Sequence, residues 1–289
     1  MYCTTSATKN PIAEPTMSLV FESAELDDLD DIMRLVKTTG WPHRAEDVSV
    51  GLALGHGLKA IHNGTVVGVA MWWTFGVATG RVGLVIVDPT AQGAGIGRAI
   101  TERVLAAAGH RALRLLATED GHRLYEKLGF VSTSKYRRNQ GVCTTYGTTN
   151  PAIRPSSEFD RARVLALDRH ATGIYRQEVI SHLFDVGQIV VLDTAKGVSG
   201  YGVSRPFGQG RVIGPIVAID ETDAIDLFHA LLSPGIIRVD RLVVDVRFGK
   251  ALEDAGLLGQ EVRDEMELGS WPIVDPGCQV FAMASHAWG

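Results

Sequence analysis

The apolar and polar positions near the start of the chain follow two different periods. Apolar side chains recur at helical spacing from Leu29 to Val36, behind two aspartates that suit a helix N-terminus. Residues 57–73 instead predict a β-hairpin with Asn63 and Gly64 at its turn, a pair that tolerates the positive φ angles of a type I′ turn. This part of the chain therefore predicts a helix followed by two antiparallel strands.

The same reading continues through the next sixty residues. Residues 81–89 are an almost wholly apolar strand, and residues 96–104 place their apolar side chains on one stripe of a helix. Residues 111–118 predict a strand, residues 120–130 a short helix and residues 130–138 a last strand. With a strand before the first helix, the predicted order is β-α-β-β-β-α-β-α-β.

From residue 152 the chain repeats much of this order. Residues 152–170 predict a strand and then a helix, and residues 188–204 predict a hairpin. The segment around Arg211 has the same Gly-Arg-Val start, apolar strand and following helix as the segment around Arg81. We therefore interpret the chain as two copies of one domain.

The breaks in periodicity divide the chain into four segments. Residues 1–17 are expected to form a disordered leader, followed by a first domain at 18–142. Glycine, threonine and proline interrupt every pattern at 143–151, which predicts a linker before a second domain at 152–289.

Composition narrows the class of protein. Of the 289 residues, 45% are hydrophobic and 21% are charged, which is typical of a soluble globular chain. A net charge of −5 gives no reason to expect nucleic acid or a membrane as a partner, and no apolar run approaches the ~20 residues of a bilayer span. The segment at 1–17 lacks the apolar stretch of a secretion signal, and three cysteines are scattered along the chain. We expect a cytoplasmic protein without a metal site, either a monomer or a homodimer.

Three glycines, Gly93, Gly95 and Gly97, lie between an apolar strand and a helix pattern. The free backbone N–H groups of a helix N-terminus suit a phosphate or pyrophosphate, which side chains would obstruct. The spacing is not that of the Rossmann fingerprint, and Arg98-Ala99 does not supply the Gly-Lys-Ser/Thr of a P-loop. The alternative to a phosphate loop is a structural glycine turn.

The loop resembles the Gln/Arg-x-x-Gly-x-Gly/Ala motif of the GNAT superfamily of N-acetyltransferases, with Gln92, Gly95 and Gly97 at its fixed positions. The segment LYEKLGF at 124–130 is similar to that family's Tyr-x-x-x-Gly-Phe segment. The second half resembles the degenerate C-terminal GNAT-like domain of bacterial two-domain acetyltransferases, on its IGPIVAID, SGYGVSRP and EMELGSW segments. The resemblance implies an α/β (α+β) fold of two GNAT-like domains, each a mixed, mostly antiparallel central sheet flanked by helices.

The resemblance also implies an activity, the transfer of an acetyl group from acetyl-CoA to a primary amine of a small molecule. The co-substrate would contact one strand, the glycine loop and one tyrosine, namely Val85, Ile86, Val87, Gln92, Gly93, Ala94, Gly95, Ile96, Gly97, Arg98 and Tyr125. In that family a strand N–H polarises the acetyl carbonyl, a role assigned here to Val87. A tyrosine protonates the departing thiolate, which makes Tyr125 the general acid. Without the motif, Tyr125 is interpreted as a packing residue.

The acceptor side is less defined by the sequence. Residues 84–87 lack the glutamate that many family members carry on this strand, so the general base is open between His43, a water relay and another group. Candidate acceptor contacts are Trp41, Trp72, Trp73, Arg176 and Tyr201, with Arg205 as a further one. Successive strand residues point to opposite faces, so one of Trp72 and Trp73 is expected in the core. The acidic balance of the chain mildly favours a cationic acceptor.

Two other functions remain open, a protein or peptide N-acetyltransferase and a non-catalytic acyl-CoA-binding sensor. The missing strand glutamate supports the sensor. In the second half, residues 219–228 contain no glycine and four acidic residues, which predicts a capped helix that repels a pyrophosphate. One acetyl-CoA per chain, bound by the first domain, is therefore expected.

Overall fold

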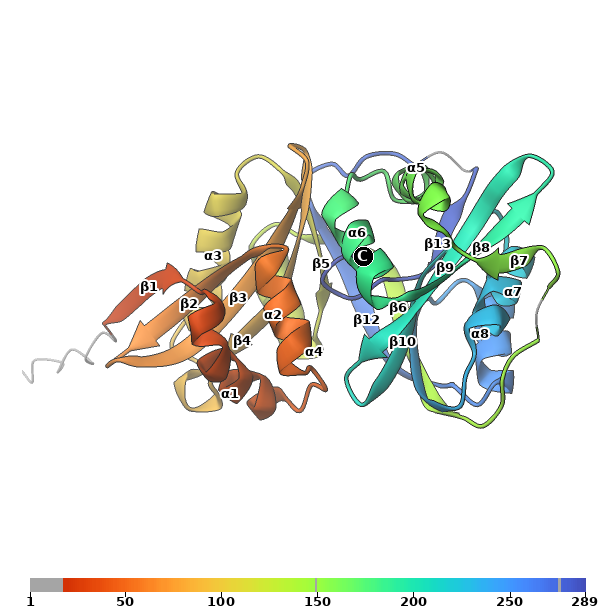
Figure 1. Cartoon of the computed structure of the whole chain (residues 1–289). Helices are drawn as coiled ribbons and strands as arrows, with labels where there is room; N and C mark the ends of the chain where they lie inside the picture. Colours follow the sequence, from red (N-terminus) through yellow and green to blue (C-terminus); the bar gives the residue numbers. More distant parts are fainter. Residues whose placement is uncertain (1–17, 149, 275–276) are drawn as a thin grey trace, which may run out of the picture.

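The structure is a computed structural model that describes residues 18–148, 150–274 and 277–289, so the predicted leader lies outside the described residues. The strands of the described residues form one sheet of thirteen, in the order β1-β2-β3-β4-β5-β12-β6-β11-β13-β10-β9-β8-β7 (Figure 1). Most neighbours in this sheet are antiparallel, and β4–β5 and β10–β11 are parallel. The mixed, mostly antiparallel sheet with flanking helices is thus confirmed.

In the part that the structure describes, the first half contributes six strands and four α-helices. They are β1 (Leu19–Ser23), α1 (Leu29–Thr39), α2 (Ala45–Ala53), β2 (His56–His62), β3 (Thr65–Phe75), β4 (Thr79–Val87), α3 (Ile96–Ala108), β5 (Ala112–Ala117), α4 (Glu119–Lys127) and β6 (Val131–Cys143). The second half repeats the order with β7 (Ile153–Pro155), α5 (Arg161–Thr172), α6 (Gln177–Val186), β8 (Gln188–Thr194), β9 (Gly197–Phe207), β10 (Gly210–Ala218), α7 (Glu221–Leu231), β11 (Gly235–Leu242), α8 (Val246–Asp254), β12 (Leu258–Leu268) and β13 (Gln279–Ala282). Short 3₁₀ turns precede α1 and α5 and follow β4, at Leu26–Asp28, Glu158–Asp160 and Pro89–Ala91.

The element order predicted for the first half is confirmed except for α2, and the elements predicted between residues 152 and 232 are confirmed except for α6. Asn63 and Gly64 both have positive φ, 49° and 76°, as the predicted hairpin turn requires. The missed helices, α2 and α6, occupy equivalent places in the two halves. In α2, Gly51 interrupts the apolar pattern at a position that packs closely against the ring of Trp73.

The two halves exchange a strand. β12, from the second half, lies between β5 and β6, with Met266 opposite Leu115 of β5 and Arg263 opposite Tyr136 of β6. β6, from the first half, also pairs with β11 of the second half over eight residue pairs. Each half is therefore completed by the other, and the sheet continues without a break from one half into the next.

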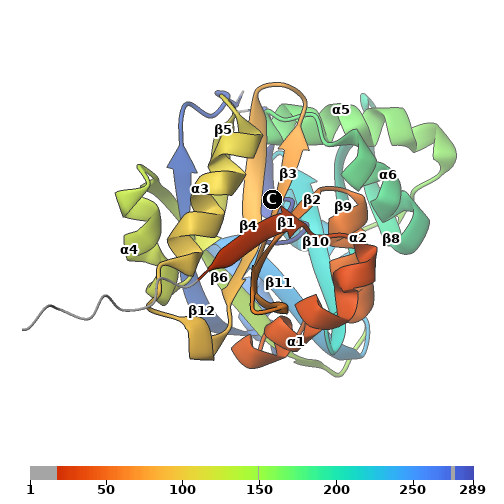
Figure 2. The same cartoon turned by 90° about the vertical axis from the view of Figure 1, so that its left-hand side faces the viewer.

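Helices cover both faces of this sheet. α1, α2, α5 and α6 pack on one face and share a hydrophobic core that includes Leu35, Trp73 and Tyr201. α3 and α4 cover the other face of the first half, and α7 and α8 that of the second (Figure 2 shows α3 and α4 opposite α1 and α2). Among the described residues, no helix has both the length and the apolar character needed to cross a membrane.

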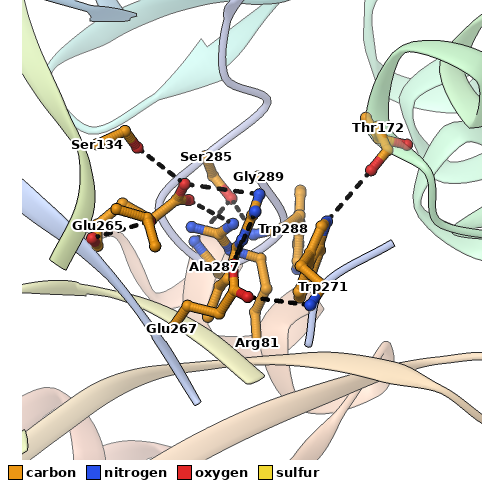
Figure 3. Close-up of polar contacts among 12 residues, drawn as sticks. Arg81, Ser134, Thr172, Glu265, Glu267, Trp271, Ser285, Ala287, Trp288 and Gly289 are labelled. Carbon is orange, nitrogen blue, oxygen red and sulfur yellow. Dashed lines mark hydrogen bonds and ion pairs between the residues drawn. The ribbon is translucent and has the colours of Figure 1, made fainter. Parts of the chain in front are cut away.

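A polar network fixes β12 against the first half (Figure 3). The guanidinium of Arg81 on β4 donates to Glu265 on β12 over 2.9 Å, and both side chains are buried. Ser134 of β6 donates to the same carboxylate over 3.1 Å, and beyond the end of β12 the indole N–H of Trp271 donates to the carbonyl of Thr172 at the end of α5. These contacts join three strands and one helix that come from both halves.

Candidate active site

A cavity of about 360 Å³ lies where the two halves meet. One wall comes from the first half, with residues of the segment 41–51 and of the strands β3, β4 and β5. The other comes from β9, β11, the exchanged strands β6 and β12, and the segment 284–288. The cavity is therefore built jointly by both halves.

The cavity begins where β4 and β5 separate. The two strands pair in parallel only from Thr79 to Arg81 on the β4 side. Past this point the register of β4 against β3 shifts beside Leu84, whose φ is +49°. Such a bulge bends a strand away from its neighbour. Leu84 and Val85 line the cavity, as does Leu116 of β5.

The three strand residues predicted to bind the co-substrate have different surroundings. Val85 lines the cavity. Ile86 is buried and lies opposite Val69 of β3, and Val87 lies opposite Gly68, outside the cavity wall. Of these three residues, Val85 is thus the one that lines the cavity.

The glycine loop is exposed and ends at the N-terminus of α3. Gly93 and Gly95 have φ of +81° and +79°, conformations that other residues rarely adopt, and Gly95 is the N-cap residue. Gly97 lies inside the helix with ordinary φ. Within the described residues, no side chain caps α3. Its first backbone N–H groups therefore face an open surface, with the helix dipole behind them, as an anion site requires.

The ends of this loop are held by short polar contacts. The amide of Gln92 donates to the carbonyl of Val87 over 3.2 Å. Arg98 is exposed and pairs with Glu102 one turn later, over 2.8 Å. Gly97 lies close to α4, because a Cβ placed on it would be 3.7 Å from Leu124. The loop is thus adjacent to the helix that carries the predicted general acid.

Tyr125, on α4, lines the cavity and packs its ring edge-on against Phe130. Burial raises the pKa of Tyr125 to about 12. The hydroxyl therefore keeps its proton at neutral pH and is available as a hydrogen-bond or proton donor. The Thr118 side chain, which accepts from the N–H of Gly121, caps α4 and fixes its first turn.

His43 also lines the cavity, from the loop before α2. Its ring makes edge-to-face contacts with Trp41 at 6.0 Å and with Phe207 of β9 at 5.6 Å. Burial, followed by the positive charge of Arg238, lowers the pKa of His43 to about 4. The imidazole is therefore neutral at pH 7 and can accept a proton, although only as a weak base.

The tryptophans divide as strand alternation predicts. Trp73 is buried, lines the cavity and donates from its indole N–H to the carbonyl of Gly51 over 2.9 Å. Trp72 points to the opposite face and stacks on His56 with 5.0 Å between the ring centres. Trp41 lines the cavity. Two of the three tryptophans proposed for the acceptor side are thus at the cavity.

Arg176 and Tyr201 do not reach the cavity. Both are buried and bind the carboxylate of Asp168, with 2.8 Å between Nε of Arg176 and Oδ2 of that carboxylate. Arg176 also donates to the carbonyl oxygens of Trp288 and Gly289, each over 2.6 Å. Both side chains thus share Asp168 as a partner inside the core, and Arg176 also holds the C-terminal residues in place. Arg205, on the same strand as Tyr201, does line the cavity.

Charged side chains at the cavity were largely missed by sequence reasoning. Among the described residues, the lining contains five arginines and three carboxylates, namely Arg44, Arg138, Arg205, Arg238 and Arg263 with Glu46, Asp47 and Asp240. This excess of positive charge is opposite in sign to the net charge of the chain. Arg138, Arg238 and Arg263 belong to β6, β11 and β12, so the strand exchange places them, and local sequence carries no signal for it. In the described part of the chain, no cluster of three or more His, Cys, Asp or Glu side chains could hold a metal ion.

The comparisons with known proteins agree with this architecture. Two family models of the GNAT acetyltransferase domain match the chain, one at residues 54–132 and one at 164–272. A curated relative, the uncharacterized N-acetyltransferase YitH of Bacillus subtilis, is 26% identical over 240 residues, which are 78% of this chain and 83% of the relative.

Solved structures show the same fold over nearly the whole chain. An assumed acetyltransferase of Pyrococcus horikoshii superposes with a TM-score of 0.78 at 18% identity, covering 98% of this chain and 99% of that one. A GCN5-related N-acetyltransferase of Sphaerobacter thermophilus superposes with a TM-score of 0.63 at 13% identity, covering 89% and 98%. The two matched domains, the relative and the shared fold together place this chain in the GNAT superfamily of acetyltransferases, with two GNAT domains in tandem.

Proposed function

We propose that the protein transfers an acetyl group from acetyl-CoA to a primary amine of a small molecule, with co-substrate bound by the first half and acceptor in the cavity between the halves. The observation that carries the proposal is the adjacency of three features in the first half. Leu84 and Val85 at the bulge of β4 line the cavity together with Tyr125 of α4, and the uncapped N-terminus of α3 lies next to α4, where a Cβ on Gly97 would be 3.7 Å from Leu124. An anion site, a carbonyl-binding backbone and an acid are the groups that acetyl transfer needs.

Acetyl-CoA supplies the activated acetyl group as a thioester. In the reaction the amine nitrogen bonds to the acetyl carbon, the carbon–sulfur bond breaks, the amine loses one proton and the sulfur gains one. We assign the hydroxyl of Tyr125 as the donor of the proton that the sulfur gains. We assign carbonyl polarisation to the backbone at Val85 in place of Val87, because Val85 is the one at the cavity.

The acceptor amine must be unprotonated to attack the acetyl carbon, so it either enters the cavity in its neutral form or loses a proton there. A net positive environment lowers the pKa of an amine, and among the described residues the five arginines that line this cavity outnumber its three carboxylates. The amine therefore loses its proton more easily here than in water, and a weak base suffices. We propose neutral His43 for that role, since its ring faces the cavity beside Trp41 and Phe207.

Free thiol released from acetyl-CoA in the presence of a pooled amine library tests this function. Release that depends on both the enzyme and an amine, with the acetylated amine found by mass spectrometry, is the expected result. Acetyl-CoA binding by calorimetry without turnover on any amine would instead identify a sensor. Turnover on lysine-containing or N-terminal peptides alone would identify a protein acetyltransferase, which the enclosure of the cavity by both halves argues against.

A further inference from the structure

Arg205 is a buried charge that the protein itself leaves unmatched. Its side chain on β9 is 5% exposed and lines the cavity. Its two terminal nitrogens donate to the carbonyl of Ala284 over 3.0 Å and to the carbonyl of Pro206 over 3.4 Å, while Nε is buried without a hydrogen-bond partner. Among the described residues, no carboxylate lies within 4.0 Å of this guanidinium, the distance that defines the ion pairs of the structure. Buried charges are usually paired, so an unpaired one at a cavity indicates a missing partner.

Nearby carboxylates already have partners. Asp47 binds Arg44 with 2.7 Å between Oδ1 and Nη2, and Asp240 binds Arg238 over 2.7 Å. Outside the lining, Glu261 pairs with Arg263 over 2.8 Å and lies 3.5 Å from Arg138. Apart from Glu46, which lines the cavity but is exposed, each of these acids thus pairs with another arginine, and within the described residues Arg205 is left without a carboxylate at ion-pair distance.

Two guanidinium groups share one aromatic ring. Arg205 lies 5.2 Å and Arg238 lies 5.3 Å from the centre of the Phe207 ring. Arg205 also lies 5.3 Å from the ring of Trp288. Burial, with smaller effects from the charges of Arg44 and Arg238, lowers the pKa of Arg205 to about 10 against the opposing attraction of Asp47, so the group remains charged at pH 7. The aromatic rings orient the planar guanidinium groups, and their mutual repulsion would be relieved by an anion between them.

We propose that the acceptor carries an oxyanion group, a carboxylate or a phosphate, in addition to its amine, and that Arg205 binds this group with the help of Arg238. The inference rests on the proposed acetyl transfer and names the acceptor class. A planar guanidinium matches carboxylate and phosphate geometry with two parallel N–H donors. Arg205 is thus a specificity-determining residue of the cavity, and amino acids or aminoalkyl phosphates are the acceptor class that it selects.

The first test measures binding without any reaction. Trp41, Trp73 and Trp288 line the cavity, so their fluorescence reports what enters it. The full-length protein is titrated with N-acetylglycine, with inorganic phosphate and with the neutral N-acetylglycinamide. We expect a saturable change with one or both anions and at least tenfold weaker binding of the amide, which is the low end for a lost charged hydrogen bond. Equal responses to anions and amide would overturn the inference.

The second test changes Arg205 itself. Arg205→Met is expected to weaken anion binding about tenfold to a hundredfold, while Arg205→Lys, which keeps the charge, is expected to lose less. Arg247→Met is the matched control, since Arg247 is exposed on α8 at the far side of the second half (Figure 1). Circular dichroism and acetyl-CoA affinity check that each variant is folded. A folded Arg205→Met variant that binds anions like the wild type would refute the role of Arg205.

Turnover separates this inference from the proposed function. A pool of amino acids and aminoalkyl phosphates is compared with a pool of amino-acid amides and neutral alkylamines. Faster thiol release with the anionic pool, and a KM raised by Arg205→Met with little change in kcat, supports the inference. Turnover on the neutral pool alone would sink the inference and leave acetyl transfer standing. Anion binding that depends on Arg205, without turnover on either pool, would keep the anion site and remove the proposed function.

Discussion

β4 and β10 occupy equivalent positions in the two halves, but the space next to each strand is filled differently. Each pairs in parallel with the next strand for a few residues and then shifts register against its hairpin partner, β4 beside Leu84 and β10 between Ile213 and Ile216. In the first half the resulting separation opens into the cavity. In the second half β13 fills it, since Ala282 pairs with both Ile216 of β10 and Arg241 of β11.

The helix N-termini that follow these two strands also differ, because one is open and the other is capped. α3 begins at Gly95 without a side-chain cap within the described residues, whereas the Asp220 carboxylate caps α7 and accepts from the N–H groups of Thr222 and Asp223. The predicted capped helix of the second half is thus confirmed. The backbone N–H groups that could bind a phosphate at the start of α3 are therefore matched, at the start of α7, by N–H groups that already bind the Asp220 carboxylate.

The ends of α4 and α8 have one backbone geometry but different chemistry. The N–H of Phe130 donates to the carbonyl of Tyr125 over 3.0 Å, and the N–H of Leu257 donates to the carbonyl of Leu252 over 2.9 Å. Leu252 is fully buried and offers no hydroxyl where Tyr125 has one. The second half therefore keeps the scaffold and lacks the reactive groups, which indicates that it serves as a wall of the cavity.

The largest expected effect comes from Gly97→Glu. Space exists for a Cβ there, 3.6 Å from Val87, and an acid in the first turn of a helix suits its dipole, so the fold should survive. A carboxylate close to a pyrophosphate costs about 1–4 kcal/mol per charge pair at ~4 Å, depending on burial. We expect acetyl-CoA binding to fall by about 100-fold or more in calorimetry, since each ~1.4 kcal/mol is tenfold.

Gly97→Ala and Asp223→Ala are the matched controls in the two halves. Both should leave the affinity within about threefold, because neither adds charge at the α3 terminus. Wild-type protein should bind one acetyl-CoA per chain. Binding of a second acetyl-CoA per chain, made tighter by Asp223→Ala, would show that the second half still binds the co-substrate although β13 lies between β10 and β11. That result would contradict the proposed difference between the two halves.

Glu265→Gln should have the next largest effect, on stability. Its carboxylate is the counterion of buried Arg81, and among the described residues no other acid pairs with that guanidinium. Breaking a buried ion pair typically costs about 3–5 kcal/mol. The corresponding arginine of the second half, Arg211, lies at a half-buried site, and the partner of its side chain among the described residues is Ser204, so Arg211→Met should cost about 1–2 kcal/mol. Urea unfolding of both variants measures the difference, and equal losses would contradict a special role for β12 in joining the halves.

Features decided by neighbouring residues were predictable from the sequence. The turn at Asn63 and Gly64, the glycine loop and the opposite faces of Trp72 and Trp73 each follow from local backbone rules, and the structure has them. The loop motif also carried the superfamily, which the domain matches confirm.

Features decided by contacts between distant segments were not predictable. The pairing of β12 with β5 joins residues about 150 apart, as Glu267 and Arg114 show, and strand alternation alone does not say which strand is a neighbour. Arg238 and Arg263 reach the cavity only through this exchange. Arg176 and Tyr201 were predicted to contact the acceptor, but both bind Asp168 inside the core, and this contact between distant residues cannot be read from the sequence.

Tyr125→Phe should lower kcat by about 100-fold, the low end for a general acid. Phenylalanine keeps the ring contact with Phe130, and the hydroxyl is the only group removed. Acetyl-CoA affinity should therefore change little, which steady-state kinetics and calorimetry together establish. Leu252→Phe in the second half is the matched change at a position without a hydroxyl and should leave kcat unaltered in any folded variant. Wild-type turnover of Tyr125→Phe, with chemistry shown to be rate-limiting, would return this tyrosine to a packing role.

The smallest expected effect, Asp220→Ala, tests whether the second half has become purely structural. The Asp220 carboxylate accepts from Thr222 over 2.8 Å and from Asp223 over 3.0 Å, so its removal exposes two N–H groups at the α7 terminus. Loss of such a cap costs about 1 kcal/mol, which urea unfolding resolves. Freeing these donors should not create a second acetyl-CoA site, because β13 still occupies the gap between β10 and β11 where the rest of the co-substrate would have to lie. Unchanged stoichiometry with reduced stability is therefore expected, whereas a gained second site would show that the cap alone keeps co-substrate out of the second half.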